Sequence, residues 1–452
     1  MFSKISSNKF SLGYSISSFL ITFGAITLYK SVTTNLFLIG ANIFDLIIYT
    51  AFFSGFSFIL ALLTPLLGSI SDKKKRGSRR SPYLIIGIVG MSLMTFLYYF
   101  SPLSFGSTDL FLNILYFGIM QGIYIFSSIV FNIGFISLFP EMFRDLNSRT
   151  KVIGLLLGFS ALGSLIIVIL EVFFNLEELY FGIIFVLLIV LGGIILFRYG
   201  FDEPYLRLSE KPKSNEHASY KILSSNNKLF IWFLIAFFFI TISEALIEGA
   251  LTYIWGFNLE NITPSLIEIN TFFMNIIPSV AIIAFLLYWR KLSLSIGIKK
   301  LLKILLLALL IFSLALLFLS DLISAYILTF LINLSLSGLS FVKLLFLAII
   351  IDHYFLNTGR RCEATYFGFN YMFNLISGFI GIYLGQFATV FSMLFITISG
   401  PDGFQEYYFF NKIGISLIAL IFIGISMVLI RKIPLDTEKY YKIEKEITEI
   451  NT

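Results

Sequence analysis

The sequence predicts an all-α polytopic membrane protein with twelve transmembrane helices in two pseudo-symmetric six-helix halves. The prediction rests on composition, on the length of the apolar runs and on the placement of basic residues. Of the 452 residues, 58% are apolar and 13% are charged, and the mean hydropathy is +0.92. A soluble domain is about half apolar and about a quarter charged. The composition therefore excludes a cytosolic enzyme, a nucleic-acid binder and a secreted module.

The lengths of the apolar runs give the count of spans. A helix crosses the hydrocarbon core with about 20 mostly apolar residues. The runs are continuous, as at 304–319, and do not alternate in polarity as the strands of a membrane barrel do, so helices are favoured. The predicted spans cover residues 12–36, 42–70, 82–101, 110–139, 150–174, 178–199, 228–257, 266–289, 298–319, 322–351, 362–397 and 408–431.

The basic residues orient these spans. The chain has 32 Lys and Arg. All but Lys30, Lys343 and Lys412 lie at the N-terminus, in or beside the even-numbered loops, or in the C-terminal tail, whereas the odd-numbered loops carry acids. The positive-inside rule then predicts that both termini are cytoplasmic. The net charge of +6 thus indicates orientation and not an anionic partner such as nucleic acid.

A central polar stretch divides the chain in two. Two six-helix halves with a substrate site between them are the plan of many secondary transporters. A weak repeat supports the division, because an acid-then-arginine segment follows the fourth span (140–149) and another follows the tenth (352–363). The predicted divisions are an N-terminal half, a cytoplasmic central loop, a C-terminal half and a cytoplasmic tail, at 1–199, 200–227, 228–431 and 432–452.

Three loop segments carry a resemblance to a known family. Residues 68–83, G-S-I-S-D-K-K-K-R-G-S-R-R-S-P-Y, look like the major facilitator signature, and their Pro-Tyr ending resembles the version in the glycoside–pentoside–hexuronide:cation symporters. Residues 137–149 resemble the S-L-x-P-E…E-R-T segment of those symporters. Residues 352–363 resemble their D-x-x-x-x-x-T-G-x-R-x-E segment. The resemblance implies the major facilitator fold and transport by alternating access.

The acids that serve cation and sugar binding in the symporters are not matched. The resemblance would put acids at Thr64 and Leu60 in the second span and at Asn132 in the fourth, and a sugar-gripping arginine at Leu157. The first span contains no carboxylate. The resemblance therefore extends to the loops and not to the sodium and galactoside chemistry. Vacuolar amino-acid effluxers also have a Pro-x-x-Gly-x-x-x-Asp turn after the second span, so they stay a possible relative.

The matched loops imply gating residues. In major facilitators the aspartate at Asp72 caps a neighbouring helix and pairs with arginine, here Arg79 or Arg80, which holds the inside shut. The matching latches are expected within Glu141–Arg149 and within Asp352–Arg361. The alternative interpretation is that these charges only obey the positive-inside rule. The candidate gating residues are Gly68, Asp72, Arg79, Arg80, Glu141, Arg149, Asp352, Gly359, Arg361 and Glu363.

Three ionisable residues fall inside predicted spans, where charge is costly and usually functional. Glu244 and Glu248 are four residues apart in the span at 228–257, so they share one helix face. Lys343 lies in the span at 322–351. The resemblance implies that both spans line the central cavity. We expect Glu244 or Glu248 to couple a cation, with Lys343 as countercharge or substrate contact. A static buried ion pair is the alternative.

Uncharged polar and aromatic residues are the remaining binding candidates. Asn132 and Gln121 in the fourth span and Asn35 in the first are expected to contact substrate. Tyr124 and Tyr253 are the aromatic candidates. Polar side chains in membrane helices also pair with one another across helices, and that is the competing interpretation.

The leading functional hypothesis is a secondary transporter of a small polar solute, a sugar or glycoside, coupled to protons rather than sodium. No cofactor and no metal are expected, and the single cysteine, Cys362, excludes an internal disulfide. The expected setting is the plasma membrane, with lipid around a monomer that binds no nucleic acid. An exporter of amino acids or other metabolites is the second hypothesis. A non-transporting membrane subunit or sensor is the third, and a membrane enzyme the weakest.

Overall fold

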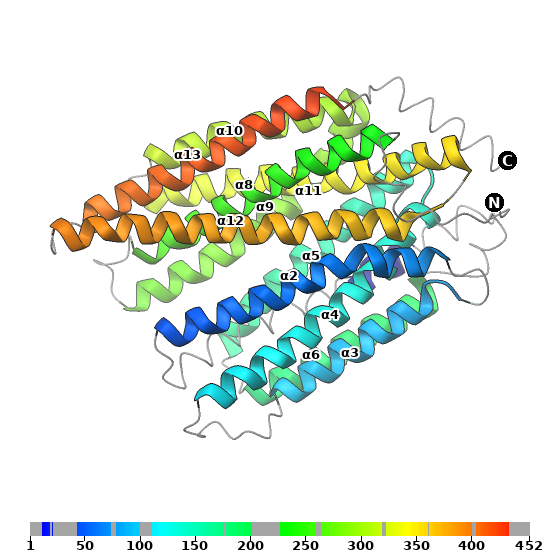
Figure 1. Ribbon diagram of the computed structural model, residues 1–452, viewed down its shortest axis with the longest axis horizontal. Coiled ribbons are helices and arrows are strands. Elements are labelled where there is room, and N and C mark those ends of the chain that lie inside the picture. Colours follow the sequence, from blue (N-terminus) through cyan, green and yellow to red (C-terminus); the bar gives the residue numbers. More distant parts are fainter. Residues whose placement is uncertain are drawn as a thin grey trace. The chain divides into compact units, whose positions relative to one another are not determined.

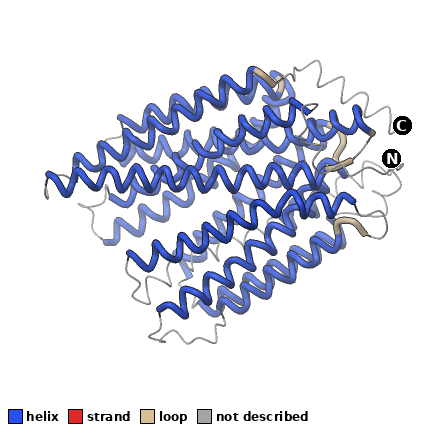
Figure 2. Tube along the Cα trace, viewed as in Figure 1, coloured by secondary structure: helices blue, strands red, loops and turns tan. Residues whose placement is uncertain are grey.

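The computed structural model describes the chain as a set of long helices. Every regular element in the described part of the chain is a helix (Figure 2). The described residues are 11–18, 20, 43–73, 78–99, 110–174, 178–200, 227–257, 264–318, 322–359, 361–399 and 404–433. The elements are α2 (Ile43–Lys73), α3 (Ser81–Tyr99), α4 (Leu110–Met142), α5 (Leu146–Phe174), α6 (Glu178–Ile195), the π-helix η1 (Leu196–Gly200), α8 (Lys228–Phe257), α9 (Pro264–Ile296), α10 (Ile298–Ala315), the 3-10 helix η4 (Leu316–Phe318), α11 (Leu322–Thr358), α12 (Glu363–Ser399) and α13 (Phe404–Arg431) (Figure 1).

The fold class predicted from sequence is confirmed. Within the described residues, eleven helices are long and apolar enough to cross a membrane. Of the first predicted span, 12–36, residues 12–18 and 20 are described, and they are helical. Large apolar side chains such as Phe318 (83% exposed), Leu287 (74%) and Ile323 (71%) lie on the outside. Such a surface suits lipid and would not suit water, and the chain is an integral membrane protein.

Several helices run further than the sequence predicted, among them α4 and α11. The fourth and tenth spans were expected to end at 139 and 351, but α4 ends at Met142 and α11 at Thr358. Glu141 and Asp352 therefore lie in helices and not in the turns after them. After α11, Gly359 has φ 68°, and its N–H donates to the carbonyl of Phe355 (2.7 Å). A left-handed residue of this kind ends a helix, and glycine adopts it without a steric penalty.

The chain separates into two compact units. The N-terminal unit comprises Met1–Ile222, Ile351–Met372 and Ile443–Thr452. The C-terminal unit comprises Leu223–Ile350 and Phe373–Lys442. The end of α11 and the start of α12 thus belong with α2 to α6, although they come late in the sequence. The predicted division into two halves, a central loop and a tail stays a prediction.

Each unit has a close-packed interior. In the N-terminal unit, the ring of Tyr14 stacks on Phe135 (centroids 4.1 Å apart), and its hydroxyl donates to the Phe135 carbonyl (2.7 Å). This contact ties the described start of the chain to α4. In the C-terminal unit, α8 packs along α13, with Phe239 stacked on Phe422 (5.6 Å). Without a hydrophobic driving force between helices in lipid, packing and hydrogen bonds of this kind hold the bundle together.

Candidate functional site

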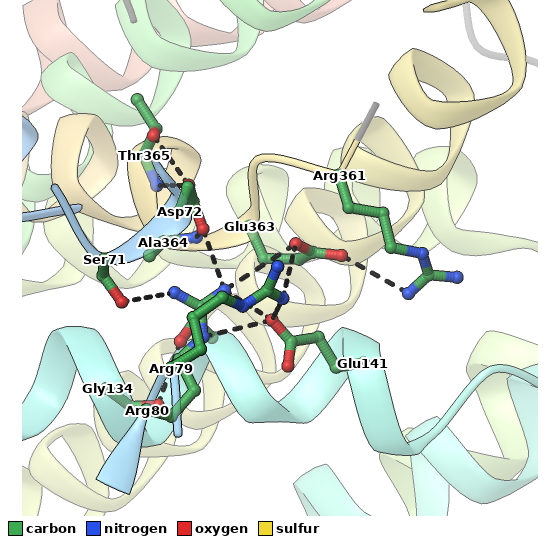
Figure 3. Close-up of polar contacts among 11 residues, drawn as sticks. Ser71, Asp72, Arg79, Arg80, Gly134, Glu141, Arg361, Glu363, Ala364 and Thr365 are labelled. Carbon is green, nitrogen blue, oxygen red and sulfur yellow. Dashed lines mark hydrogen bonds and ion pairs between the residues drawn. The ribbon is translucent and has the colours of Figure 1, made fainter. Parts of the chain in front are cut away.

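A buried charge cluster lies in the N-terminal unit. It contains three arginines and three carboxylates, so its formal charges balance. Side chains from the ends of α2 and α4, from the segment before α3 and from the start of α12 converge there (Figure 3). The members of this charge cluster are Asp72, Arg79, Arg80, Glu141, Arg361 and Glu363.

Arg80 is the centre of the charge cluster. It is fully buried, and its guanidinium pairs with Glu141 and with Asp72 (Nη2–Oδ1 2.9 Å). Nη1 also donates to the hydroxyl of Ser71 (2.6 Å). Burial lowers the pKa of the Arg80 guanidinium, but attraction by Glu141, with smaller contributions from Asp72 and Glu363, outweighs burial and the repulsion from Arg79. The pKa is raised above its ordinary value, so Arg80 is a permanent cation.

Asp72 joins α2 to the first turn of α12. Its Oδ2 accepts hydrogen bonds from the backbone N–H of Thr365 (2.8 Å) and from the Thr365 hydroxyl (2.7 Å). Its Oδ1 accepts a longer one from the N–H of Ala364 (3.3 Å). The first N–H groups of a helix have no partner within the helix, and the helix dipole favours an anion there. Asp72 caps α12 from another helix, as the resemblance implied, and pairs with Arg80.

Glu363 brings the remaining arginines together. It is 1% exposed, and its Oε2 lies 3.8 Å from Arg80 Nη2 and 3.9 Å from Arg79 Nη2. Its Oε1 lies 3.4 Å from Arg361 Nη1. Arg79 in turn donates to Glu141 (2.6 Å). Each carboxylate therefore faces at least one arginine, which is the condition under which buried charge is tolerated.

A second buried ion pair lies in the same unit. Arg149, at the start of α5, pairs with Asp352 near the end of α11, and its Nε donates to the carbonyl of Phe143 (2.7 Å). The sequence led us to expect latches within Glu141–Arg149 and within Asp352–Arg361. The observed pairing is a correction, because Glu141 pairs with Arg79 and Arg80 whereas Asp352 pairs with Arg149. Ion pairs are selected by how helix ends cross, which sequence proximity does not show.

The contact between α2 and α12 continues inward from Asp72. A Cβ added at Gly68 would overlap the carbonyl oxygen of Ala364, and one added at Gly368 would lie 2.6 Å from the carbonyl oxygen of Thr64. The hydroxyl of Thr64 lies 2.8 Å from the Gly368 carbonyl. Only residues without a side chain permit such an approach. This contact, the α2–α12 seam, explains why glycine occupies position 68 of the predicted gating set.

The C-terminal unit contains the membrane-embedded charges predicted from sequence. Lys343 on α11 donates to the hydroxyl of Thr241 on α8 (3.0 Å), and its ammonium lies 5.5 Å from the centre of the Phe237 ring. Glu244 is half-buried and close enough to Lys343 for electrostatic attraction, while Glu248, one turn further along, is exposed. The structure thus brings Glu244 and Lys343 together, with Glu248 at the edge of the group.

The predicted polar contacts fall into two groups. Asn132, Gln121 and Tyr124 lie on α4, where Gln121 and Tyr124 are buried. The amide of Asn132 donates to the hydroxyl of Ser128 (3.2 Å). Asn35 and the side chain of Tyr253 lie outside the described residues.

Several residues that contact these sites were not predicted from the sequence. Ser71 and Thr365 bind members of the charge cluster, Thr241 binds Lys343, and Tyr371 lies next to Asn132. Ser71 and Thr365 neighbour matched motif residues, which was a usable signal. Tyr371 is one of 23 tyrosines, so composition offered no reason to select it.

Comparison with solved structures supports the fold. A bacterial homologue of the iron transporter ferroportin in an outward-facing state has a TM-score of 0.61 and 14% identity, over 93% of this chain and 98% of that one. The human organic anion transporter MFSD10 (TETRAN) has a TM-score of 0.57 and 13% identity, over 94% and 98%. At such identities the likeness concerns the fold alone. No curated protein matches the chain.

The family comparison covers nearly the whole chain. Residues 15–437 match the family described as "MFS/sugar transport protein". The matched range includes the charge cluster, the Arg149–Asp352 pair and the Glu244–Lys343 group. Membership of the narrower glycoside–pentoside–hexuronide:cation symporters stays an expectation from the loop motifs. The chain belongs to the MFS/sugar transport protein family and is a major facilitator superfamily transporter.

Proposed function

We propose that the protein is a secondary active transporter that moves a small polar solute, a sugar or glycoside, by alternating access with proton coupling. The observation that carries the gating part is the charge cluster with its α2–α12 seam. While Asp72 caps α12 and Arg80 holds Glu141, the start of α12 stays packed against α2 and α4. Opening this end requires that six charges exchange their partners for water.

The coupling proposal rests on Glu244 and Lys343. A carboxylate next to an ammonium stays ionised, whereas the same carboxylate away from the cation in an apolar setting takes up a proton. A change in the Glu244–Lys343 contact during the transport cycle would therefore load and release one proton. Proton is favoured over sodium because Thr64 and Asn132 stand where the symporters have carboxylates. We further propose a monomer in the plasma membrane with both termini in the cytoplasm.

Other assignments differ in a measurable way. An exporter of amino acids would use Glu244 and Lys343 to bind a zwitterion. Transport of iron or of an organic anion is a further alternative, because two solved structures of similar fold are described as a homologue of an iron transporter and as an organic anion transporter. A non-transporting sensor has less support, because a scaffold need not keep costly buried charge.

The test is transport by the purified protein in liposomes. Uptake and counterflow are measured over a panel of neutral sugars, amino acids, organic anions and ferrous iron, with an imposed proton or sodium gradient. Accumulation of a sugar driven by the proton gradient supports the proposal. A response to sodium alone contradicts proton coupling, and transport restricted to amino acids favours the alternative.

A further inference from the structure

An uncharged polar patch lies on α4 and the start of α12, both in the N-terminal unit. Tyr124, Ser128 and Asn132 are spaced by four residues on α4, so they share one helix face. The Asn132 amide donates to the Ser128 hydroxyl (3.2 Å), and the Asn132 side chain also lies near the phenol of Tyr371. Asn132 thus lies next to Tyr371, which is half-buried.

The hydroxyl of Tyr124 has no hydrogen-bond partner among the described residues, although Tyr124 is only 5% exposed. It lies close enough to Tyr371 and Tyr99 for an electrostatic interaction. Ser127 on α4, by contrast, donates to the Ile123 carbonyl of its own helix (2.8 Å). A tyrosine hydroxyl is too far from its own backbone for that. Leaving a buried hydroxyl without a hydrogen bond is destabilising, and a hydrogen bond to a solute hydroxyl would remove that penalty.

The two helices that carry the patch, and α3, which packs against α4, contain no formal charge along their membrane-spanning parts. The sequence has no Asp, Glu, Lys or Arg between Leu110 and Pro140 on α4, throughout α3, or between Ala364 and Ser399 on α12. A carboxylate or phosphate entering here would lose its hydration without meeting a cation, which is strongly unfavourable. A neutral group with hydroxyls loses much less and can form hydrogen bonds with the phenols. The patch therefore suits the uncharged, hydroxylated part of a solute.

We propose that Tyr124 and Tyr371, the latter next to Asn132, form a subsite that recognises a hydroxyl group of a neutral, sugar-like solute. The inference rests on the proposed transport function and adds the residues that select the solute. Tyr124 donates its free hydroxyl hydrogen to the solute. The half-buried phenol of Tyr371 supplies a second polar contact and an apolar ring face.

The test is counterflow by the full-length protein in liposomes, with radiolabelled D-xylose, D-galactose and myo-inositol as neutral probes and D-glucuronate and L-lysine as charged ones. For a neutral probe that wild type exchanges, Tyr124→Phe and Tyr371→Phe should each raise the half-saturating concentration about tenfold, the effect of losing about 1.4 kcal/mol of binding. The increase should vanish for the deoxy analogue that lacks the recognised hydroxyl. Tyr116→Phe is the matched control, because the Tyr116 hydroxyl on the same helix already donates to the Leu97 carbonyl (2.9 Å).

The outcomes distinguish failure of the tyrosine subsite from failure of the proposed transport function. Thermal unfolding of each variant with and without the probe shows whether it is folded and whether the probe still stabilises it. Half-saturating concentrations in both tyrosine variants equal to that of Tyr116→Phe overturn the subsite but leave transport intact. Exchange of charged probes only overturns the neutral assignment. Absence of counterflow for every probe overturns the proposed function and the subsite with it.

Discussion

The hydroxyl of Thr64 on α2 lies 2.8 Å from the backbone carbonyl of Gly368 on α12. It is equally close to the carbonyl of Ala61, which cannot bond to its usual partner four residues on because Pro65 has no N–H. The Thr64 hydroxyl thus donates both to a carbonyl that the proline leaves without its helical partner and to a carbonyl of the neighbouring helix α12. The symporters that the loops resemble have an acid at this position. In this protein the position is part of a helix contact about two turns from Asp72.

Because α2 and α12 are in close contact at the α2–α12 seam, replacing a glycine of α12 by a larger residue should be disruptive at the seam and harmless away from it. Gly368→Val would force a side chain against the carbonyl of Thr64 and the Cα of Pro65, 2.6 Å and 3.0 Å from an added Cβ. Overpacking of this kind costs about 1–3 kcal/mol, so α12 should move away from α2 and Cys362 should become reactive. The measurement is the rate of labelling by a membrane-impermeant maleimide. Gly378→Val on the same helix is the control, because nothing lies within 4 Å of an added Cβ there; equal labelling in the two variants contradicts the seam.

The Arg149–Asp352 pair predicts rescue by charge exchange. Asp352→Asn leaves a buried arginine without its anion, and breaking a buried pair costs about 3–5 kcal/mol. The thermal midpoint should fall markedly. The exchanged variant Arg149→Asp with Asp352→Arg should recover part of the loss, although the bond from Arg149 to the Phe143 carbonyl is not restored. A double variant no better than the sum of its single variants would show that the two residues do not act as a pair.

The cap on α12 predicts a different response for two aspartates. Asp72→Asn removes the anion from the first turn of α12 and from Arg80, so the closed end should open more often and Cys362 labelling should rise. Asp145→Asn is the matched control, because Asp145 is exposed and accepts a hydrogen bond from the neighbouring Ser148 N–H (2.8 Å). A rise of equal size in both variants would mean that only general surface charge matters.

If Glu244 couples transport to protons, its neutralisation should affect accumulation against a gradient and counterflow differently. Glu244→Gln keeps the shape of the side chain but removes its titratable group, so accumulation against a gradient should be lost while counterflow continues. Glu244→Asp should keep part of the accumulation. Both modes are measured in the same liposomes with an imposed proton gradient. Full accumulation by the Gln variant eliminates Glu244 as the coupling group.

Composition and helix length were sufficient to predict the architecture, because lipid requires long apolar spans whatever else the chain does. The loop motifs selected the gating residues, and the structure brings Asp72, Arg80, Glu141 and Glu363 into one cluster. The observed partners of Glu141 and Asp352 could not be read from the chain, since they depend on how helix ends cross. Tyr371 was missed for another reason: it lies in the eleventh predicted span, whereas the uncharged candidates were taken from the first, fourth and seventh spans.

The reactivity of Cys362 tests alternating access most directly. Cys362 is the only cysteine of the chain, is 7% exposed and lies between Arg361 and Glu363 of the charge cluster, so no other thiol needs to be removed. We predict that maleimide labelling in liposomes is slow at rest and accelerates when a transported solute is added at saturating concentration. Labelling should also be fast without solute in Asp72→Asn. Cys362 that stays protected in wild type while counterflow proceeds would contradict the account, because solute would then pass without the charge cluster opening.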